Sequence, residues 1–307
     1  MLCVLYVNAV TALLCIIVML VERVLPADWP RRWLWCGALA ISIALPGYYR
    51  NHHSWSVAQI PADTAVDTTW WSRIDAFDST IHDIWLVSSA LLIAWGVVSI
   101  IRVAIIVRNA RRASLNPSNI DEVPVVVTDL TGPATVGLLR PHVLVPRWVL
   151  ALPGPQRRYV LRHEDEHRKA HDARLLFIAS MTLILMPWNL ALWWHLRRLR
   201  LAVEMDCDSR VVGALGDARA YGELLLKVAQ ASSRGPSLQP ALLGVGMLER
   251  RLTQLVAPAP LKHAHRFLLP AVAIGLLFIV LKMPHPVFEH TPTSHATMTS
   301  QARAGLK

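Results

Sequence analysis

Long apolar stretches separated by short charged segments dominate the pattern of this 307-residue chain. Four of them stand out, at residues 2–21, 33–49, 84–107 and 267–283. Each is close to the length of about 20 residues that a helix needs to cross the hydrocarbon core of a bilayer. The pattern predicts four transmembrane helices, although the short second stretch also suits a helix buried in a protein core.

A short β-rich region lies between the third and fourth apolar stretches. Residues 123–128 are mostly β-branched and include Pro124, which favours an edge strand because proline cannot donate a ladder hydrogen bond. A turn-rich loop at 131–137 leads to a second short strand at 143–146. We expect a small β-hairpin, which either accepts an extended substrate as an added strand or simply caps a helical domain.

The composition supports a membrane setting. Apolar residues make up 54% of the chain, charged residues 17%, and the mean hydropathy is +0.38, whereas a soluble domain usually carries about a quarter charged residues. The first apolar stretch is not a convincing cleavable signal peptide, because no basic residue precedes it. The four cysteines indicate no disulfide framework, since three of them lie in or near apolar stretches.

The charges between the apolar stretches predict an orientation. Residues 51–83 carry five aspartates against one arginine, whereas basic residues flank the other ends of the stretches, at Arg23, Arg31, Arg32, Arg108, Arg111, Arg112, Lys262 and Arg266. The positive-inside rule then places both termini outside and residues 108–266 in the cytoplasm. The net charge of +10 belongs to this cytoplasmic face, and because no nucleic-acid recognition module is present we expect no direct nucleic-acid partner.

The most informative motif is H-E-x-x-H, formed by residues 163–167. On a helix, His163 and His167 fall one turn apart on the same face, so both imidazoles can reach one Zn²⁺ while Glu164 acts on a metal-bound water. Asp165 and Glu166, in the middle of the motif, are expected on a solvated helix face.

A second acidic motif, Glu-x-x-x-Asp, follows at Glu204 and Asp208. In one class of zinc metallopeptidases, a glutamate on a second helix is the third ligand and an aspartate one turn later steadies a ligand histidine. We therefore expect one Zn²⁺ per chain with an open fourth position. We interpret Cys207 as a small buried residue, with a metal-ligand role as the alternative. Tyr221 is one candidate donor to the oxyanion that forms during peptide cleavage.

The segment between the two motifs is itself strongly apolar. A simple crossing would put His167 and Glu204 on opposite sides of a bilayer about 30 Å thick, although both must reach one ion. Pro187 breaks or kinks a helix, so we predict a membrane-dipping helical pair over residues 174–196. The alternative is a long helix within a protein core.

Several ordered motifs together resemble one family, the BlaR/MecR-type membrane-embedded zinc metallopeptidases. The resemblance covers roughly residues 1–283, and its specific part lies between about 124 and 255. It rests on the Gly-Pro-Ala-Thr-Val-Gly run at 132–137, the zinc motif with Asp172 beyond it, the acidic motif at 202–208, and Leu-Glu-Arg-Arg-Leu at 248–252, which also looks like an amphipathic helix. The resemblance implies that His163, His167 and Glu204 bind zinc and that Glu164 is the catalytic base.

The expected fold class is mainly α: a multi-span helical membrane protein with an embedded zincin-like metallopeptidase domain. Residues 1–107 would hold three transmembrane helices, residues 108–266 the peptidase domain on the cytoplasmic side, and residues 267–307 the last span and a short external tail. The resemblance implies a bacterial inner-membrane location and regulated cleavage of the protein itself or of a cytoplasmic repressor. It also implies a link to β-lactam or cell-wall stress, and so to the regulation of antibiotic resistance.

One departure from the family concerns the sensor. Members that sense β-lactams carry a penicillin-binding-like domain outside the last span, and residues 284–307 contain no S-x-x-K motif. We expect this chain to lack that domain and to receive its signal from a separate sensor partner, the membrane or the outer loop at 50–83; a homodimer stays open. The alternative functions are quality control of membrane proteins, in the style of the HtpX and CAAX-type proteases, and a non-catalytic signal-coupling scaffold.

Overall fold

The structure is a computed structural model that describes residues 2–25, 29–52, 78–113, 118–128, 132–232, 241–256 and 263–282. Most of the expected outer loop and the external tail lie outside the described residues. The prediction of a mainly helical fold is confirmed.

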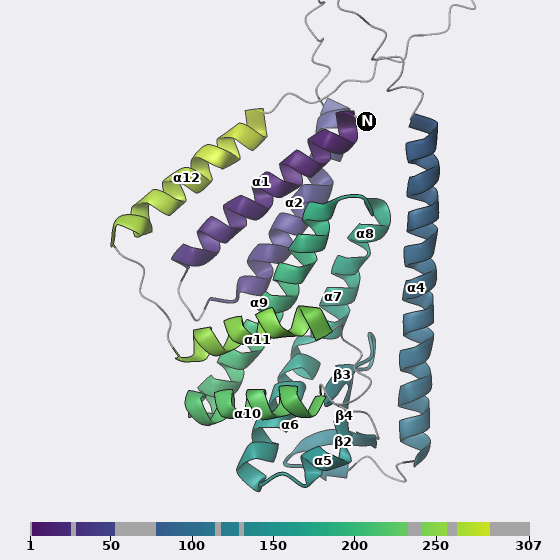
Figure 1. Cartoon of the computed structure of the whole chain (residues 1–307), viewed down its shortest axis with the longest axis vertical. Helices are drawn as coiled ribbons and strands as arrows, with labels where there is room; N and C mark the ends of the chain where they lie inside the picture. The colour runs from purple at the N-terminus through teal and green to yellow at the C-terminus, as the bar shows by residue number, and fades with distance from the viewer. Residues whose placement is uncertain are drawn as a thin grey trace, which may run out of the picture.

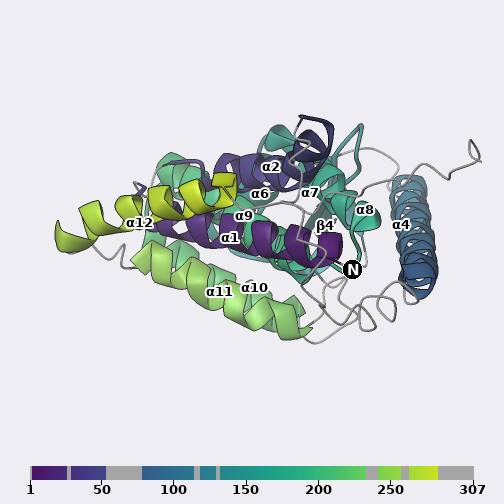
Figure 2. The same cartoon turned by 90° about the horizontal axis from the view of Figure 1, so that it is seen from above.

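Four long helices coincide with the four apolar stretches: α1 (Leu2–Val24), α2 (Arg31–His52), α4 (Asp78–Ala113) and α12 (His263–Lys282). Helix α1 packs against α12 on one side and against α2 on the other (Figure 1). Helix α4 stands apart at the edge of the molecule in both views and touches the rest mainly through α8 and β2 (Figures 1 and 2).

Two segments of the described chain are long and apolar enough to cross a membrane, Val4–Val24 and His82–Asn109, and Leu268–Leu281 is a shorter apolar helix. Helix α2 is not among them, because Arg31, Arg32 and Arg50 leave it a shorter apolar run. The four expected spans therefore stay a prediction: among the described residues, α1 and α4 contain candidates by length and composition, and the apolar parts of α2 and α12 do not reach that length.

The β-rich region is a four-stranded sheet in the order β1-β2-β4-β3, so the predicted simple hairpin is wrong. Its strands are β1 (Ser118–Ile120), β2 (Val123–Thr128), β3 (Ala134–Val136) and β4 (His142–Pro146). Strand β2 is internal, antiparallel to β1 and parallel to β4, which also corrects its assignment as an edge strand. Pro124 is tolerated because the ladder to β4 begins only at Val125.

The sheet and α6 (Gly154–Ala170) share an apolar core. Valines of β2 and β4 pack with Val149 of α5 (Arg147–Leu150), with Val160 and Leu161 of α6, and with Leu224 of α10 (Ala218–Ser232). This packing turns one face of α6 toward the sheet and leaves the face with the zinc motif toward α9. Helix α11 (Ala241–Val256) lies on α9 and α10.

The apolar segment after α6 folds back on itself. Helices α7 (Asp172–Ser180) and α8 (Thr182–Leu185) lead to a turn at Pro187, and α9 (Leu190–Leu215) returns beside them (Figure 1). Asn189 caps α9 by accepting a hydrogen bond from the backbone N–H of Leu192 at 3.1 Å. The predicted helical return at Pro187 is therefore present, and its insertion into a bilayer stays a prediction. Since α9 continues without a break to residue 215, it carries the second acidic motif back to α6.

Candidate metal centre

The turn between α6 and α7 places Asp172 beside His167 of the zinc motif. Helix α6 ends at Ala170, and its C-cap residue His171 has a left-handed φ of 55°, an uncommon conformation for a residue with a side chain. The chain therefore reverses sharply between α6 and α7. As a result Asp172, the first residue of α7, lies against His167, with 2.8 Å between its Oδ2 and the imidazole Nδ1.

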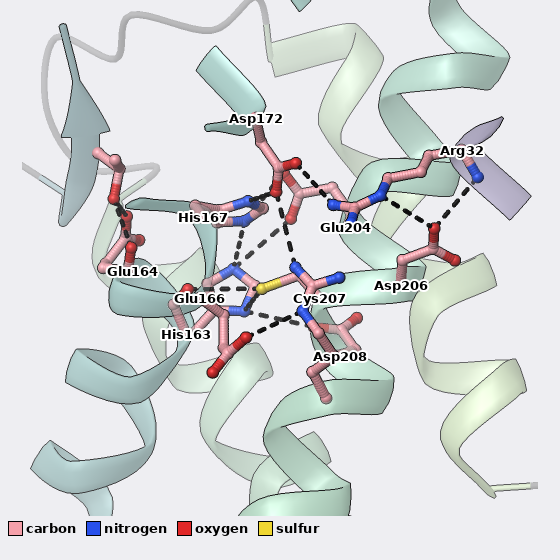
Figure 3. A network of polar contacts seen from close by, with 12 residues as sticks. Arg32, His163, Glu164, Glu166, His167, Asp172, Glu204, Asp206, Cys207 and Asp208 are labelled. Atoms are coloured by element: carbon pink, nitrogen blue, oxygen red, sulfur yellow. Dashed lines mark hydrogen bonds and ion pairs between the residues drawn. The ribbon is translucent and has the colours of Figure 1, made fainter. Parts of the chain in front are cut away.

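The Nε2 atoms of the two motif histidines converge on one point (Figure 3). They lie 3.2 Å apart, and the Glu204 carboxylate oxygens lie 3.6 Å from His163 Nε2 and 3.8 Å from His167 Nε2. Ligand atoms about 2.0–2.1 Å from a tetrahedral zinc are about 3.3 Å from one another. The three side chains expected as ligands are thus brought together, at separations close to those that a zinc ion requires.

The outer nitrogens of both imidazoles are held by hydrogen-bond acceptors. His167 Nδ1 faces Asp172, and His163 Nδ1 lies 2.9 Å from the Tyr221 hydroxyl, which itself donates to Asp208 Oδ1 at 2.6 Å. If each Nδ1 carries its proton toward these acceptors, each Nε2 is left with a free lone pair for a metal.

Two expectations are corrected by this arrangement. Asp208 Oδ1 is 3.5 Å from His163 Nδ1, so it supports that imidazole mainly through Tyr221, while Asp172 takes the direct supporting role on His167. Tyr221 is fully buried, and its hydroxyl is engaged by both Asp208 and His163. It is therefore not available as the oxyanion donor.

Arg251 of α11 connects the two acidic residues of α9. Its Nε and Nη2 donate to the two Asp208 oxygens at 2.7 Å each, and its Nη1 lies 3.0 Å from Glu204 Oε2. The predicted amphipathic helix packs three leucines, Leu248, Leu252 and Leu255, against a buried cluster that contains Tyr221 and Val211. That packing turns Arg251 into the site, a role that the sequence pattern did not reveal.

The electrostatic environment favours positive charge between the histidines and Glu204. Burial alone would lower the pKa of His163, but Cys207 and Glu204 outweigh it and raise this pKa to about 10. Burial is likewise outweighed at His167, whose pKa is raised by Glu204 and Asp172. The pKa of Glu204 is lowered despite burial, because Arg251 and His167 stabilise the carboxylate. A cluster that stabilises protonated imidazoles beside a carboxylate suits a cation.

Glu164 points away from the convergent nitrogens toward β3 (Figure 3). The Thr135 hydroxyl of β3 lies 3.0 Å from Glu164 Oε2 and 2.7 Å from the Glu164 carbonyl oxygen. The following loop depends on Gly137, whose φ is +109° and where a Cβ atom would lie 2.6 Å from the Arg140 carbonyl oxygen. The Gly-Pro-Ala-Thr-Val-Gly run thus has a structural reason, and Thr135 is a site residue that sequence reasoning missed.

Asp165 and Glu166 do not lie on a solvated face, which corrects the prediction. Both side chains are buried. Their charges are compensated by neighbouring cations: Arg168 and Lys169 for Asp165, and Arg162 and Arg210 for Glu166. They support the site through ion pairs and are not turned toward the convergent Nε2 atoms.

Cys207 offers an alternative set of ligand atoms. With His163 and His167 it forms a group of three potential ligands within 4.8 Å of one another. Its thiol is fully buried and lies 3.3 Å from Nδ1 of His163, whereas Glu204 faces Nε2 of both histidines. We favour Glu204 because its two oxygens approach the atoms that already converge.

Comparison with known proteins adds a family match. The sequence model described as BlaR1 peptidase M56 matches residues 2–255, well over half of the chain. One curated relative is the regulatory protein BlaR1 of Bacillus licheniformis, which is 26% identical over 114 residues. The alignment covers 36% of this chain and 19% of that protein, so the chain spans about a fifth of the relative it matches.

Proposed function

Because the chain belongs to the BlaR1 peptidase M56 family, we propose that it is an integral-membrane zinc metalloendopeptidase that acts as a signal-transducing regulator. One observation carries the proposal: the Nε2 atoms of His163 and His167 meet the Glu204 carboxylate while both outer nitrogens are held by acceptors. A cluster of this kind has the donor set of a catalytic zinc site, two imidazoles and one carboxylate.

The roles of the chain's own residues follow from their positions. His163, His167 and Glu204 would hold the ion, and a bound Zn²⁺ would lower the pKa of a coordinated water toward about 7 and polarise the scissile carbonyl. Glu164 is the general base: its carboxylate takes the proton of the attacking water and passes it to the leaving amine nitrogen. Thr135 holds Glu164 Oε2 through its hydroxyl and so limits the directions in which the carboxylate can turn.

The substrate is proposed to bind along β3. In the described sheet, β3 pairs with β4 on one side, stands at the end of the strand order, and contacts α6 through Thr135 and Glu164. An extended peptide added to this edge would run past the general base. The substrate-docking strand is thus assigned to β3 and not to residues 123–128.

The regulatory part of the proposal concerns substrate and location. We assign self-cleavage or cleavage of a cytoplasmic repressor, supported by the similarity to the Bacillus licheniformis relative, which is named as a regulatory protein. The proposed setting is the bacterial inner membrane, with the site on the cytoplasmic side; the two apolar segments Val4–Val24 and His82–Asn109 support a membrane location. The proposal also includes a separate sensor protein as a partner and a homodimeric state.

The proposal is tested by comparing wild type with Glu164→Gln in detergent-purified full-length protein. Both forms are expected to bind about one zinc per chain, and the wild type alone is expected to cleave itself or a candidate repressor. Glu223→Gln, the same change at an exposed position of α10, is the matched control and should cleave like the wild type. Equal cleavage by wild type and Glu164→Gln would exclude Glu164 as the general base. Absence of zinc from both forms would exclude a zinc-dependent enzyme. Zinc in both forms with no cleavage of any protein offered would favour the signal-coupling scaffold.

A further inference from the structure

The beginning of α2 is anchored directly beside the candidate metal centre. Asp206 of α9 accepts hydrogen bonds from the first two backbone N–H groups of α2: its Oδ1 from Arg31 and its Oδ2 from Arg32, each at 3.1 Å. A carboxylate at this position satisfies donors that have no partner inside the helix and complements the helix dipole. The start of α2 is therefore fixed to the helix that carries Glu204.

The side chain of Arg32 continues from this anchor to a metal ligand. Its Nη1 donates to Asp172 Oδ1 at 3.0 Å, and the other oxygen of Asp172 lies 2.8 Å from His167 Nδ1 (Figure 3). The side chains of Arg32 and Asp172 are only 15% and 3% exposed, so water screens this pair weakly. One carboxylate thus joins a residue of α2 to an imidazole of the zinc motif, each through its own oxygen.

We propose that Arg32 is a positioning residue of the metal centre: it holds Asp172 in the orientation that supports His167, and so couples the position of α2 to metal binding. The inference rests on the proposed function, since it takes His167 as a ligand. It extends that function, because α2 packs on α1, which contains one of the two candidate membrane spans. A displacement of α2 relative to α9 would loosen Asp172 and with it His167.

The alternative support for Asp172 is weaker. Arg210 also approaches Asp172, but its Nη2 is 3.7 Å from Oδ2 and its Nε is bound to Glu166 at 2.9 Å. Without Arg32, Asp172 keeps its contact with His167 but loses the hydrogen bond that fixes its second oxygen. Outer partners of metal ligands typically change metal affinity by about 10–100-fold when they are removed. Because Arg32 acts one contact farther out, we expect the lower end, about tenfold.

The test uses full-length protein in lipid nanodiscs and measures zinc affinity by competition with a chelator. Arg32→Met keeps an unbranched apolar stem and removes the guanidinium donors, and Arg32→Lys restores a cation on a side chain of similar length. The matched control is Arg198→Met, which breaks a comparably buried pair between α9 and Glu22 of α1, 14% and 11% exposed, away from the site. The absorption spectrum of the Co²⁺-substituted protein reports on ligand geometry independently of activity.

We expect Arg32→Met to weaken zinc binding about tenfold and to change the Co²⁺ spectrum, Arg32→Lys to recover most of the affinity, and Arg198→Met to match the wild type. In an Asp172→Asn background, Arg32→Met should add little further loss, because both changes act through the same contact. Equal affinity of wild type and Arg32→Met, or equal losses in Arg32→Met and Arg198→Met, would overturn the inference while leaving the metalloenzyme in place. A wild type that binds no zinc would exclude both the role of Arg32 and the proposed metallopeptidase function.

Discussion

Replacing Arg251 by methionine is expected to destabilise the site strongly, because it leaves two carboxylates without their nearest cation. The guanidinium contacts Glu204 at 3.0 Å and both oxygens of Asp208 at 2.7 Å. Removing one partner of a buried ion pair costs about 3–5 kcal/mol, since the remaining charge stays desolvated. Asp208 is 3% exposed but keeps the Tyr221 hydroxyl, and Glu204 is 20% exposed. We therefore expect the lower end of the range, about 3 kcal/mol.

Thermal unfolding of detergent-purified protein measures this loss. For a domain of about 150–250 residues, about 3 kcal/mol corresponds to a fall in Tm of about 6–12 °C in the metal-free protein. Added zinc should narrow the gap, because a bound cation would neutralise Glu204 and stabilise the folded state. Arg219→Met is the control, since it breaks the exposed pair with Glu223 and should leave Tm unchanged. A metal-free Arg251→Met protein that melts within about 2 °C of the wild type would show that Arg251 does not stabilise the two carboxylates.

Two further changes test the support of the general base and of a ligand. Thr135→Val should lower kcat about tenfold, because Glu164 Oε2 loses its hydrogen bond, while zinc content stays at the wild-type value; steady-state peptide cleavage measures this, and an unchanged kcat would contradict it. Asp172→Asn should weaken zinc binding about 10–100-fold, because His167 Nδ1 loses its charged acceptor. Competition with a chelator measures the zinc affinity, and an affinity equal to that of the wild type would show that Asp172 does not support the ligand.

Local periodicity predicted much of this fold because it needs only neighbouring residues. The spacing of His163 and His167 predicts a shared helix face whatever the tertiary structure, and Pro187 predicts a break wherever its helix lies. Length and apolar content likewise predicted the four long helices. Each of these features depends only on residues within about one to six helical turns of one another in the sequence.

The supporting residues of the site could not be predicted in that way. Thr135 is 29 residues from Glu164, Arg251 is 43 from Asp208, and Arg32 is 140 from Asp172. A single sequence contains no period that links such positions, so their contacts emerge only from tertiary packing. The family motifs that contain Thr135 and Arg251 were the available signal, and for Arg32 there was none.

The wrong predictions have physical reasons as well. Asp165 and Glu166 were placed in solvent because charged helix positions usually are, yet Arg162, Arg168 and Arg210 compensate their burial. Pro124 was taken to exclude an internal strand, but it occupies a position opposite Asn119 of β1, one residue before the parallel ladder with β4 begins. For Asp165 the compensating cations, Arg168 and Lys169, lie on the same helix, whereas Glu166 also pairs with Arg210 of α9, a partner 44 residues away along the chain.

X-ray absorption spectroscopy of the zinc-loaded protein tests the central claim most directly, because it identifies the atoms that bind the ion. We expect only nitrogen and oxygen atoms directly around the zinc, at about 2.0–2.2 Å, from His163, His167 and Glu204. The spectrum of Cys207→Ala should then be the same as that of the wild type. A sulfur neighbour at about 2.3 Å that disappears in Cys207→Ala would show that the thiol, and not the Glu204 carboxylate, is the third ligand.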